Sequence, residues 1–144
     1  MTRYLLDTNM ASHIMRGDIK SVRDRLDKAT LTGDISLSVI SQAELFYGWA
    51  RRGHPAALGK LIAGFLAGVE VLPWTEAVAR TYGDLRAACE AEGISLTTSD
   101  MMIAAHAKTV GAILVTRDRA FWHIRQHLAA LEDWTVAELG FGAT

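Results

Sequence analysis

Short apolar runs alternate along this chain with longer segments in which apolar residues recur every three or four positions. The runs predict strands at residues 3–6, 35–39, 69–72 and 112–115. The longer segments predict helices at residues 8–15, 18–29, 41–51, 55–67, 75–92 and 99–110, with a short one starting near residue 118. Strands that alternate with helices in this way predict an α/β fold with a parallel sheet and helices on both faces.

Residues that begin and end helices agree with these boundaries. Thr8 or Asn9 can cap the first helix and Thr75 the fifth, because their side-chain oxygens can accept a hydrogen bond from a free backbone N–H. Gly17 and Gly93 follow the last apolar positions of their helices, where glycine commonly ends a helix. The predicted helices therefore have defined starts and stops.

The chain has the length of one ordinary domain. No repeat or interdomain linker divides its 144 residues, so we expect a single domain over residues 1–144 with a loose tail from residue 140. Beyond residue 127 the pattern weakens, and residues 134–136 are interpreted as a last edge strand. Cys89 is the only cysteine, which excludes an internal disulfide and suits the cytoplasm. We also expect no signal peptide and no membrane-spanning segment.

Four acidic residues stand where the predicted strands and helices meet. Asp7 directly follows the first strand, and Asp118 lies just beyond the strand at 112–115. Glu44 and Asp100 lie in the first turns of the helices that start near residues 41 and 99. Parallel strands joined by helices bring such positions to one end of the sheet. We therefore expect the four side chains to converge there, where open α/β sheets bind ligands.

Each acid also has an ordinary structural interpretation. Asp7 and Asp118 can cap the helices that follow them. Ser41 and Glu44 have the S-x-x-E spacing of a capping box. Asp100 suits the positive end of a helix dipole. Taken singly, the capping box is the better interpretation of Glu44, and for Asp7 the two interpretations are equally good.

Asp100 lies on an unusual helix face. Ile103, Ala104 and Ala107 share that face, so the carboxylate tops a buried stripe and needs a partner, a proton or a metal ion. Two carboxylates about 5 Å apart repel by about 3 kcal/mol at an effective dielectric of 20, so four in one cleft favour a divalent cation. Oxygen ligands without His or Cys indicate Mg²⁺, for which Mn²⁺ can substitute, and not zinc.

The net charge does not by itself point to a nucleic-acid substrate. It is −1, whereas domains that bind nucleic acid usually carry a basic face. Leaving the four candidate acids out of the count gives +3 for the rest of the chain. A mildly basic body around an acidic, metal-filled cleft is compatible with a phosphate-bearing substrate but does not require one.

Four segments together resemble the ordered motifs of PIN-domain ribonucleases. They are Leu5-Leu6-Asp7-Thr8-Asn9, Ser38-Val39-Ile40-Ser41-Gln42-Ala43-Glu44-Leu45-Phe46-Tyr47-Gly48, Asp100-Met101-Met102-Ile103-Ala104-Ala105-His106-Ala107 and Ile113-Leu114-Val115-Thr116-Arg117-Asp118. Each motif is weak alone, but the four occur in order and cover nearly the whole chain. Within the family, the chain resembles the VapC toxins of type II toxin–antitoxin pairs in particular.

The resemblance implies a PIN-like three-layer α/β/α sandwich and Mg²⁺-dependent endoribonuclease activity on structured RNA, often tRNA. The residues that it assigns to the catalytic and metal-binding quartet are Asp7, Glu44, Asp100 and Asp118. Thr8, Asn9 and Thr116 are then expected to orient these carboxylates. A metal-activated water would leave 5′-phosphate and 3′-hydroxyl ends. The resemblance further implies a homodimer and a small VapB-type antitoxin as its inhibitor.

Two other functions remain open. A phosphatase that forms an aspartyl-phosphate would use Asp7 as its nucleophile. That chemistry normally needs a second acid two residues on, where Asn9 stands, and no lysine-bearing loop is evident. A catalytically silent binding module could share the fold, but the intact acidic set argues against it.

Basic side chains near the quartet have several interpretations. Arg117 and Arg119 flank Asp118 and are either ordinary surface arginines, which we favour slightly, or contacts for substrate phosphates. His106 lies about −120° around its helix from Asp100, so we exclude it as a general base.

The apolar content suggests a partner surface. The helix at 55–67 and the aromatic residues near Glu44 carry more apolar side chains than one small domain needs, so part of them is expected to face a dimer partner or an antitoxin. Because a cation can take the place of the metal, we expect the antitoxin to insert an Arg or Lys near Asp7 and Asp100.

Overall fold

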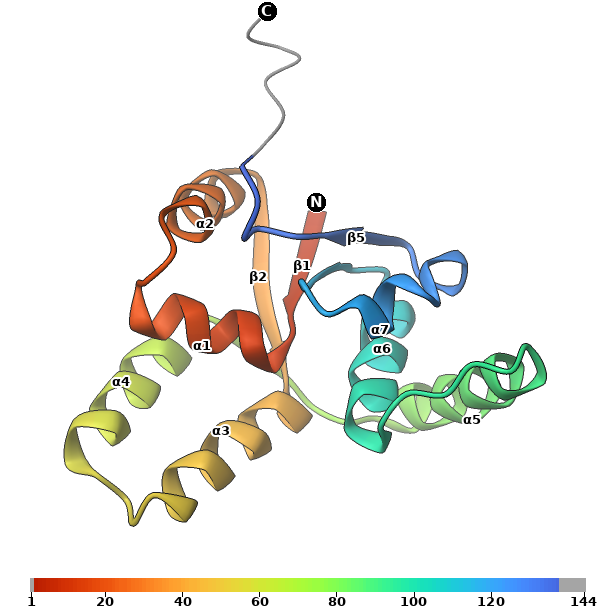
Figure 1. Ribbon diagram of the computed structural model, residues 1–144, viewed down its shortest axis with the longest axis horizontal. Helices are drawn as coiled ribbons and strands as arrows, with labels where there is room; N and C mark the ends of the chain where they lie inside the picture. The colour runs from red at the N-terminus through yellow and green to blue at the C-terminus, as the bar shows by residue number, and fades with distance from the viewer. Residues whose placement is uncertain (1, 138–144) are drawn as a thin grey trace, which may run out of the picture.

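The computed structural model describes residues 2–137, in which five parallel strands form one sheet between two layers of helices (Figure 1). The strands are β1 (Thr2–Leu6), β2 (Gly33–Ser38), β3 (Glu70–Leu72), β4 (Ile113–Val115) and β5 (Ala130–Glu132). Their order is β3-β2-β1-β4-β5, and each neighbouring pair is parallel. The chain runs outward from β1 to β3 and then returns to β4, on the other side of β1. This reversal beside β1 creates a crevice at the carboxyl ends of the strands.

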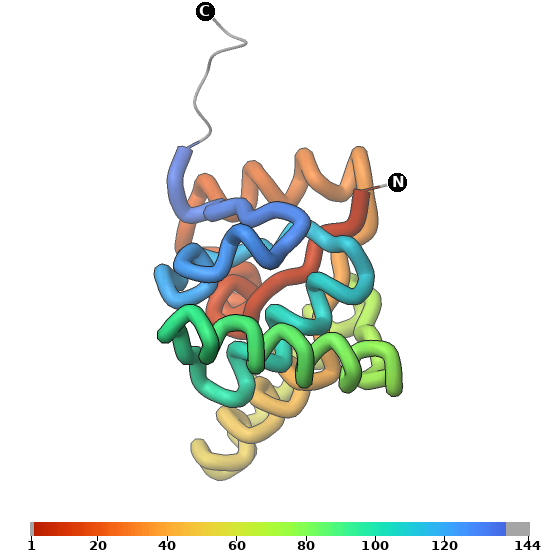
Figure 2. Tube along the Cα trace, turned by 90° about the vertical axis from the view of Figure 1, so that its right-hand side faces the viewer, coloured from red at the N-terminus to blue at the C-terminus, as the bar shows by residue number. Residues whose placement is uncertain are grey.

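Helices connect the strands and cover both faces of the sheet. They are α1 (Thr8–Arg16), α2 (Lys20–Thr32), α3 (Val39–Arg51), α4 (Ala56–Ala67), α5 (Glu76–Ala91), α6 (Thr98–Val110), α7 (Arg119–Trp122) and the 3-10 turn η1 (Arg125–His127). α1, α2 and α4 lie on one side of the sheet, and α5 and α6 lie on the other (Figure 1). The connection between α3 and α4 projects away from the body (Figure 2).

Side chains that alternate in direction along the central strands contribute to a hydrophobic core on each face of the sheet. Leu5 and Leu114 belong to the core that packs against α5 and α6. Leu6 and Val115, one residue further along, belong to the core beneath α1 and α2. All four are 0% exposed, because successive residues of a strand point to opposite faces and both faces are covered. The predicted three-layer α/β/α arrangement is confirmed.

The interpretation of residues 134–136 as the last edge strand is wrong. The strand is β5, at Ala130–Glu132, and Trp134 turns back into the core, where it is 0% exposed. Its ring centroid lies 5.6 Å from that of Tyr4, and its Nε1–H donates to Glu132 at 2.9 Å. The free energy gained by burying the large side chain of Trp134 outweighs the preference of the neighbouring residues for an extended strand. The tail expected from residue 140 lies outside the described residues.

Candidate active site

Asp7 lies directly after β1, at the reversal of strand order, and is 4% exposed. Its Oδ1 accepts the backbone N–H of Met10 at 2.7 Å, so Asp7 itself caps α1. The expectation that Thr8 or Asn9 is the cap is therefore wrong, because the helix begins as soon as the strand ends. Asp7 Oδ2 accepts the hydroxyl of Thr116 at 2.5 Å. Both oxygens of this carboxylate are held in place.

The electrostatic environment of Asp7 disfavours its ionised form. Burial raises the pKa of Asp7 from 3.8 to about 6, although the hydrogen bonds from Thr116 and Met10 lower it. The charges of Asp100 and Asp118 raise the pKa further. The ionised form of Asp7 is therefore destabilised in the folded protein, and a nearby cation would stabilise it.

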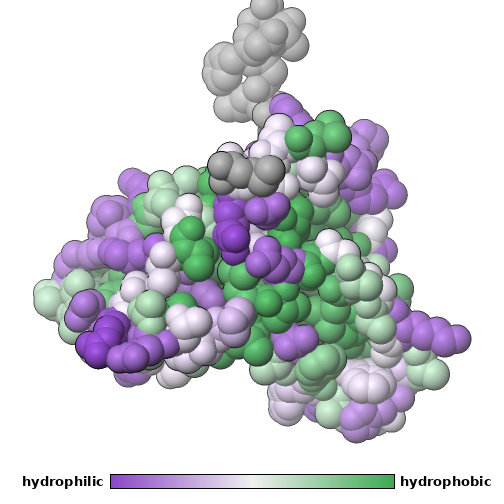
Figure 3. Space-filling model, turned by 180° about the vertical axis from the view of Figure 1, so that it is seen from behind, coloured by the Kyte–Doolittle hydropathy of each residue, from purple (hydrophilic) through white to green (hydrophobic). Residues whose placement is uncertain are grey.

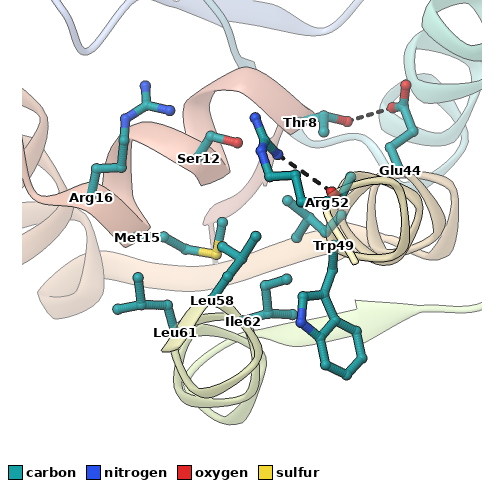
Figure 4. Close-up of a pocket in the computed structure, with 12 residues that line it drawn as sticks. Thr8, Ser12, Met15, Arg16, Glu44, Trp49, Arg52, Leu58, Leu61 and Ile62 are labelled. Atoms are coloured by element: carbon teal, nitrogen blue, oxygen red, sulfur yellow. Dashed lines mark hydrogen bonds between the residues drawn. The ribbon is translucent and has the colours of Figure 1, made fainter. Parts of the chain in front are cut away.

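Glu44 is tied to two other helices. Ser38 caps α3 through its Oγ, which accepts the N–H of Ile40 at 3.1 Å, so the capping-box interpretation of Ser41 and Glu44 is wrong. Glu44 instead accepts the hydroxyl of Thr8 at 2.6 Å (Figure 4). It also accepts the hydroxyl of Ser99 at 3.4 Å.

Ser41 joins the same network. Its Oγ lies 2.9 Å from Thr8 Oγ1. A threonine has one hydroxyl hydrogen, so when Thr8 donates to Glu44, Ser41 donates to Thr8. Thr8 thus holds one carboxylate oxygen of Glu44, while its role in supporting a catalytic quartet stays a prediction.

Asp100 lies in the first turn of α6 and is half-buried. Ile103, Ala104 and Ala107 on the same face are buried, as predicted. Burial raises the pKa of Asp100, and the charges of Asp118 and Glu44 raise it too, while the Thr97 hydroxyl lowers it. The acid therefore faces other acids as well as the core.

Asp118 caps α7, as one of its two interpretations predicted. Its Oδ1 accepts the N–H of Ala120 at 2.9 Å. Its own N–H donates to Thr116 Oγ1 at 2.9 Å, the oxygen whose hydrogen is donated to Asp7. Thr116 therefore links the chain segments that carry Asp7 and Asp118.

The four acids occupy one end of the sheet, and their charges act on one another. Within residues 2–137, however, no three His, Cys, Asp or Glu side chains are close enough to form a ready metal site. Separate hydrogen bonds hold three of these carboxylates, because Asp7 accepts from Thr116, Glu44 from Thr8 and Asp118 from Ala120. The donor set contains only hard oxygen atoms, so it fits a divalent cation once the carboxylates turn toward it.

The remaining expected residues have different surroundings. Asn9 is exposed, and its side chain makes no hydrogen bond within residues 2–137, so its orienting role stays a prediction. His106 is buried with Nδ1 2.8 Å from Ser38 Oγ, and burial lowers its pKa. Sequence reasoning missed this contact, which holds the start of α3 and thereby supports the helix that carries Glu44.

Two hollows open beside the acids. A pocket of about 350 Å³ lies between α1, α3 and α4 (Figure 4). Thr8 and Glu44 line it together with apolar side chains from α1 and α4, namely Met15, Leu58, Leu61 and Ile62. A more open basin of about 640 Å³ lies beside Asp118 and is rich in arginine. The acids therefore adjoin a pocket with many apolar side chains and a basin rich in arginine, and Arg16 and Arg52 line both.

Comparison with known proteins identifies the family. The PIN domain matches residues 4–126. The tRNA(fMet)-specific endonuclease VapC of Shigella flexneri is 31% identical over 136 residues, which cover 94% of this chain and 100% of that protein. Ribonuclease VapC2 of Haemophilus influenzae is 29% identical over 118 residues, covering 82% of this chain and 88% of that protein.

Solved structures agree with the sequence relatives. VapBC2 from Rickettsia felis, bound to a promoter DNA fragment, superposes with a TM-score of 0.85 at 28% identity, covering 92% of this chain and 99% of that chain. DNA-bound VapBC from Salmonella typhimurium gives a TM-score of 0.83 at 28% identity, with 93% and 99% covered. This chain belongs to the PIN-domain family and, within it, to the VapC ribonucleases.

Proposed function

We propose that this protein is the toxin of a toxin–antitoxin pair, a Mg²⁺-dependent endoribonuclease that cuts structured RNA in the cytoplasm. The convergence of four acids at the crevice beside β1, with a raised pKa at Asp7, carries this proposal. Its membership of the VapC ribonucleases supports the choice of RNA. A relative named for tRNA(fMet) makes tRNA the first substrate to test.

The residues have distinct roles in the proposed reaction. Asp7 and Asp100 would hold the metal ion, with Glu44 and Asp118 binding it directly or through water. The bound ion supplies a water of lowered pKa and positive charge for the phosphate oxygens. Attack of a water oxygen on phosphorus breaks the bond to the RNA 3′-oxygen, leaving 5′-phosphate and 3′-hydroxyl ends. No side chain needs to act as a nucleophile.

Hydroxyl groups of the chain hold two of the carboxylates in orientations that would suit metal binding. The Thr116 hydroxyl holds Asp7 Oδ2, and the Thr8 hydroxyl holds Glu44 Oε1. Each hydroxyl comes from a different element than the acid it binds, so the fold sets the orientation. Preorganised acids lose less freedom when a cation binds.

Cleavage of total RNA and of purified tRNA tests the proposal. Purified protein is expected to cut RNA with Mg²⁺, and EDTA or Asp7→Asn is expected to abolish cleavage. Activity that survives both changes, or products with 2′,3′-cyclic phosphates, would contradict the mechanism. Hydrolysis of p-nitrophenyl phosphate without RNA cleavage would favour the phosphatase alternative. Absence of both activities would favour the silent binding module.

The apolar pocket suggests how the VapB-type antitoxin binds. Leu61 is 50% exposed at its rim, and Glu44 lies at its acidic end. An antitoxin segment with an apolar side chain for this pocket could extend an Arg or Lys to the acids, where the cation would replace the metal. A complex in which no basic side chain enters the acidic centre would refute this arrangement.

A homodimer is the remaining part of the proposal. Phe46 and Tyr47 on α3 are 44% and 66% exposed, more than aromatic residues usually are. Apolar surface also gathers near the middle of the face opposite to that in Figure 1 (Figure 3). Sedimentation equilibrium is expected to give a dimer mass, and Tyr47→Glu is expected to weaken the dimer if α3 forms the interface.

A further inference from the structure

A basin in which half of the lining residues are arginines lies beside Asp118. Four of the 15 Lys and Arg residues in the chain line it. They are Arg16, Arg52, Arg117 and Arg119. Arg16 ends α1, Arg52 caps the end of α3, and the other two come from the start of α7 and the residue before Asp118. The net charge of the chain is −1, so this excess of positive charge is local.

Three of these arginines differ from most others in the chain. Four of the seven arginines outside the basin form ion pairs, namely Arg3–Glu70, Arg25–Glu132, Arg80–Glu76 and Arg86–Glu90. Over residues 2–137, Arg52, Arg117 and Arg119 form no ion pair, although Asp118 lines the same basin. Arg52 donates only to the Gly48 carbonyl, at a long 3.4 Å. Their guanidinium groups are therefore available to an anionic ligand.

Arg16 is already engaged. Its Nε donates to Asp18 Oδ2 at 3.1 Å, and its Nη2 lies 2.9 Å from His13 Nδ1. The ion pair offsets its charge, so Arg16 is not part of the proposed set.

Arg52 connects the basin with the neighbouring pocket. It lines the basin together with Arg117 and Arg119, and it also lines the pocket that contains Thr8 and Glu44. Arg117 and Arg119 flank Asp118. An RNA strand that crosses the acids would therefore meet guanidinium groups next to the cleavage site.

We propose that Arg52, Arg117 and Arg119 bind RNA phosphates adjacent to the phosphate that is cut. This inference rests on the proposed function. Four carboxylates repel a phosphodiester chain, and flanking arginines offset that repulsion without occupying the acids themselves. A guanidinium also presents two parallel N–H donors to one phosphate, which a lysine cannot do. Such contacts position the strand but carry no base sequence.

The lining favours RNA over an antitoxin peptide as the occupant of the basin. Four of the eight residues that line the basin are arginines, whereas the pocket between α1, α3 and α4 has many apolar side chains, such as Met15, Leu58 and Leu61. A polyanion matches the first surface, and an amphipathic peptide matches the second. Affinity measurements with both ligands would also detect the alternative, in which the antitoxin peptide binds the basin.

RNA affinity in a background that cannot cut provides the test. Asp100→Asn protein is titrated with a short fluorescent single-stranded oligoribonucleotide between about 50 and 200 mM KCl. Arg52→Ala and the double variant Arg117→Ala/Arg119→Ala are each expected to lower the affinity by about threefold or more. Each lost contact should also reduce the slope of log K against log salt by about 0.7.

Arg51→Ala is the matched control. Arg51 precedes Arg52 on α3, lies outside the basin and rests over the Tyr47 ring at 5.9 Å. Removing it is expected to leave RNA affinity and the salt slope unchanged. In active protein, the basin variants are expected to raise KM and to leave kcat at saturating RNA near the wild-type value.

The outcomes separate this inference from the proposed function. If the basin variants bind RNA as Arg51→Ala does, or lose affinity for the antitoxin alone, the inference is overturned. If RNA binding depends on the arginines but active protein cuts no RNA, the nuclease proposal fails and the phosphate contacts stand. If RNA is cut with unchanged KM in the variants, the nuclease proposal stands and the inference fails.

Discussion

Replacing Asp7 with asparagine is expected to stabilise the metal-free protein above pH 6. The side chain keeps its size, and asparagine is as good a helix cap as aspartate, so the bond from the N–H of Met10 is retained. Its amide can also donate to Thr116 Oγ1, which now accepts instead of donating. The change therefore removes the buried charge and little else.

The raised pKa of Asp7 sets the size of the effect. A pKa of about 6 against an ordinary 3.8 corresponds to about 3 kcal/mol, because one pKa unit is worth about 1.4 kcal/mol. The hydrogen bonds from Thr116 and Met10 are already included in that pKa. The expected gain in unfolding free energy is therefore about 3 kcal/mol at pH 8.

The sign of the pH dependence follows from the same shift. Below pH 4 the carboxyl is protonated in both the folded and unfolded states, so its ionisation costs nothing. Between pH 4 and pH 6 only the unfolded state has lost the proton, and wild-type stability falls as pH rises. Above pH 6 Asp7 is ionised in both states, and the full free-energy cost of its buried charge lowers the stability of the folded protein. The advantage of Asp7→Asn should therefore develop across this window and be absent at pH 4.

Urea unfolding in EDTA, followed by tryptophan fluorescence from pH 4 to 8, measures this difference. The matched control is Asp18→Asn, an exposed acid whose pKa is lowered chiefly by its hydrogen bond with Arg16, so its replacement should give no gain at pH 8. Added Mg²⁺ should stabilise the wild type more than the Asp7 variant. A variant that is less stable than the wild type at pH 8, or a difference that does not change with pH, would refute the reasoning.

Three further substitutions test other parts of the structure. Thr116→Val removes the donor to Asp7 and should lower Mg²⁺ affinity, measured by titration calorimetry, and RNA cleavage by about tenfold or more. Thr116→Ser keeps the hydroxyl and should retain both. Glu44→Gln should reduce the Mg²⁺-induced rise in unfolding free energy while leaving metal-free stability close to that of wild type. Trp134→Ala should lower the unfolding free energy by about 3–5 kcal/mol in urea, whereas Val136→Ala, at an exposed position, should change it little.

The order of the strands and helices could be predicted because each has its own periodicity. The helix starts were harder, because a sequence offers several oxygen-bearing residues and the end of the preceding strand decides which N–H groups are free. Ser38 caps α3 for this reason, and Ser41 does not. The last strand was misplaced because the local pattern around Trp134 is typical of a strand, whereas the side chain of Trp134 is buried in the core after the strand has ended.

The candidate acids could be predicted from their places after strands and in first helical turns, but their contacts could not. His106 reaches Ser38 across 68 positions of sequence, and Thr116 reaches Asp7 across 109. Only tertiary packing creates such contacts. Arg52 likewise joins Arg117 and Arg119 through the fold, which is why the latter two alone resembled ordinary surface residues.

Capping and catalysis were set against each other as interpretations of Asp7, yet in the structure the capping contact does not exclude the proposed catalytic role. One oxygen accepts the N–H of Met10 and fixes the carboxylate at the mouth of the crevice. A carboxylate that did no more than cap a helix would have a lowered pKa, because hydrogen bonds and the helix dipole favour its charge. The pKa of Asp7 is raised instead, since burial and the charges of Asp100 and Asp118 outweigh those bonds. Capping therefore explains where Asp7 lies, and burial together with the neighbouring carboxylates explains its raised pKa.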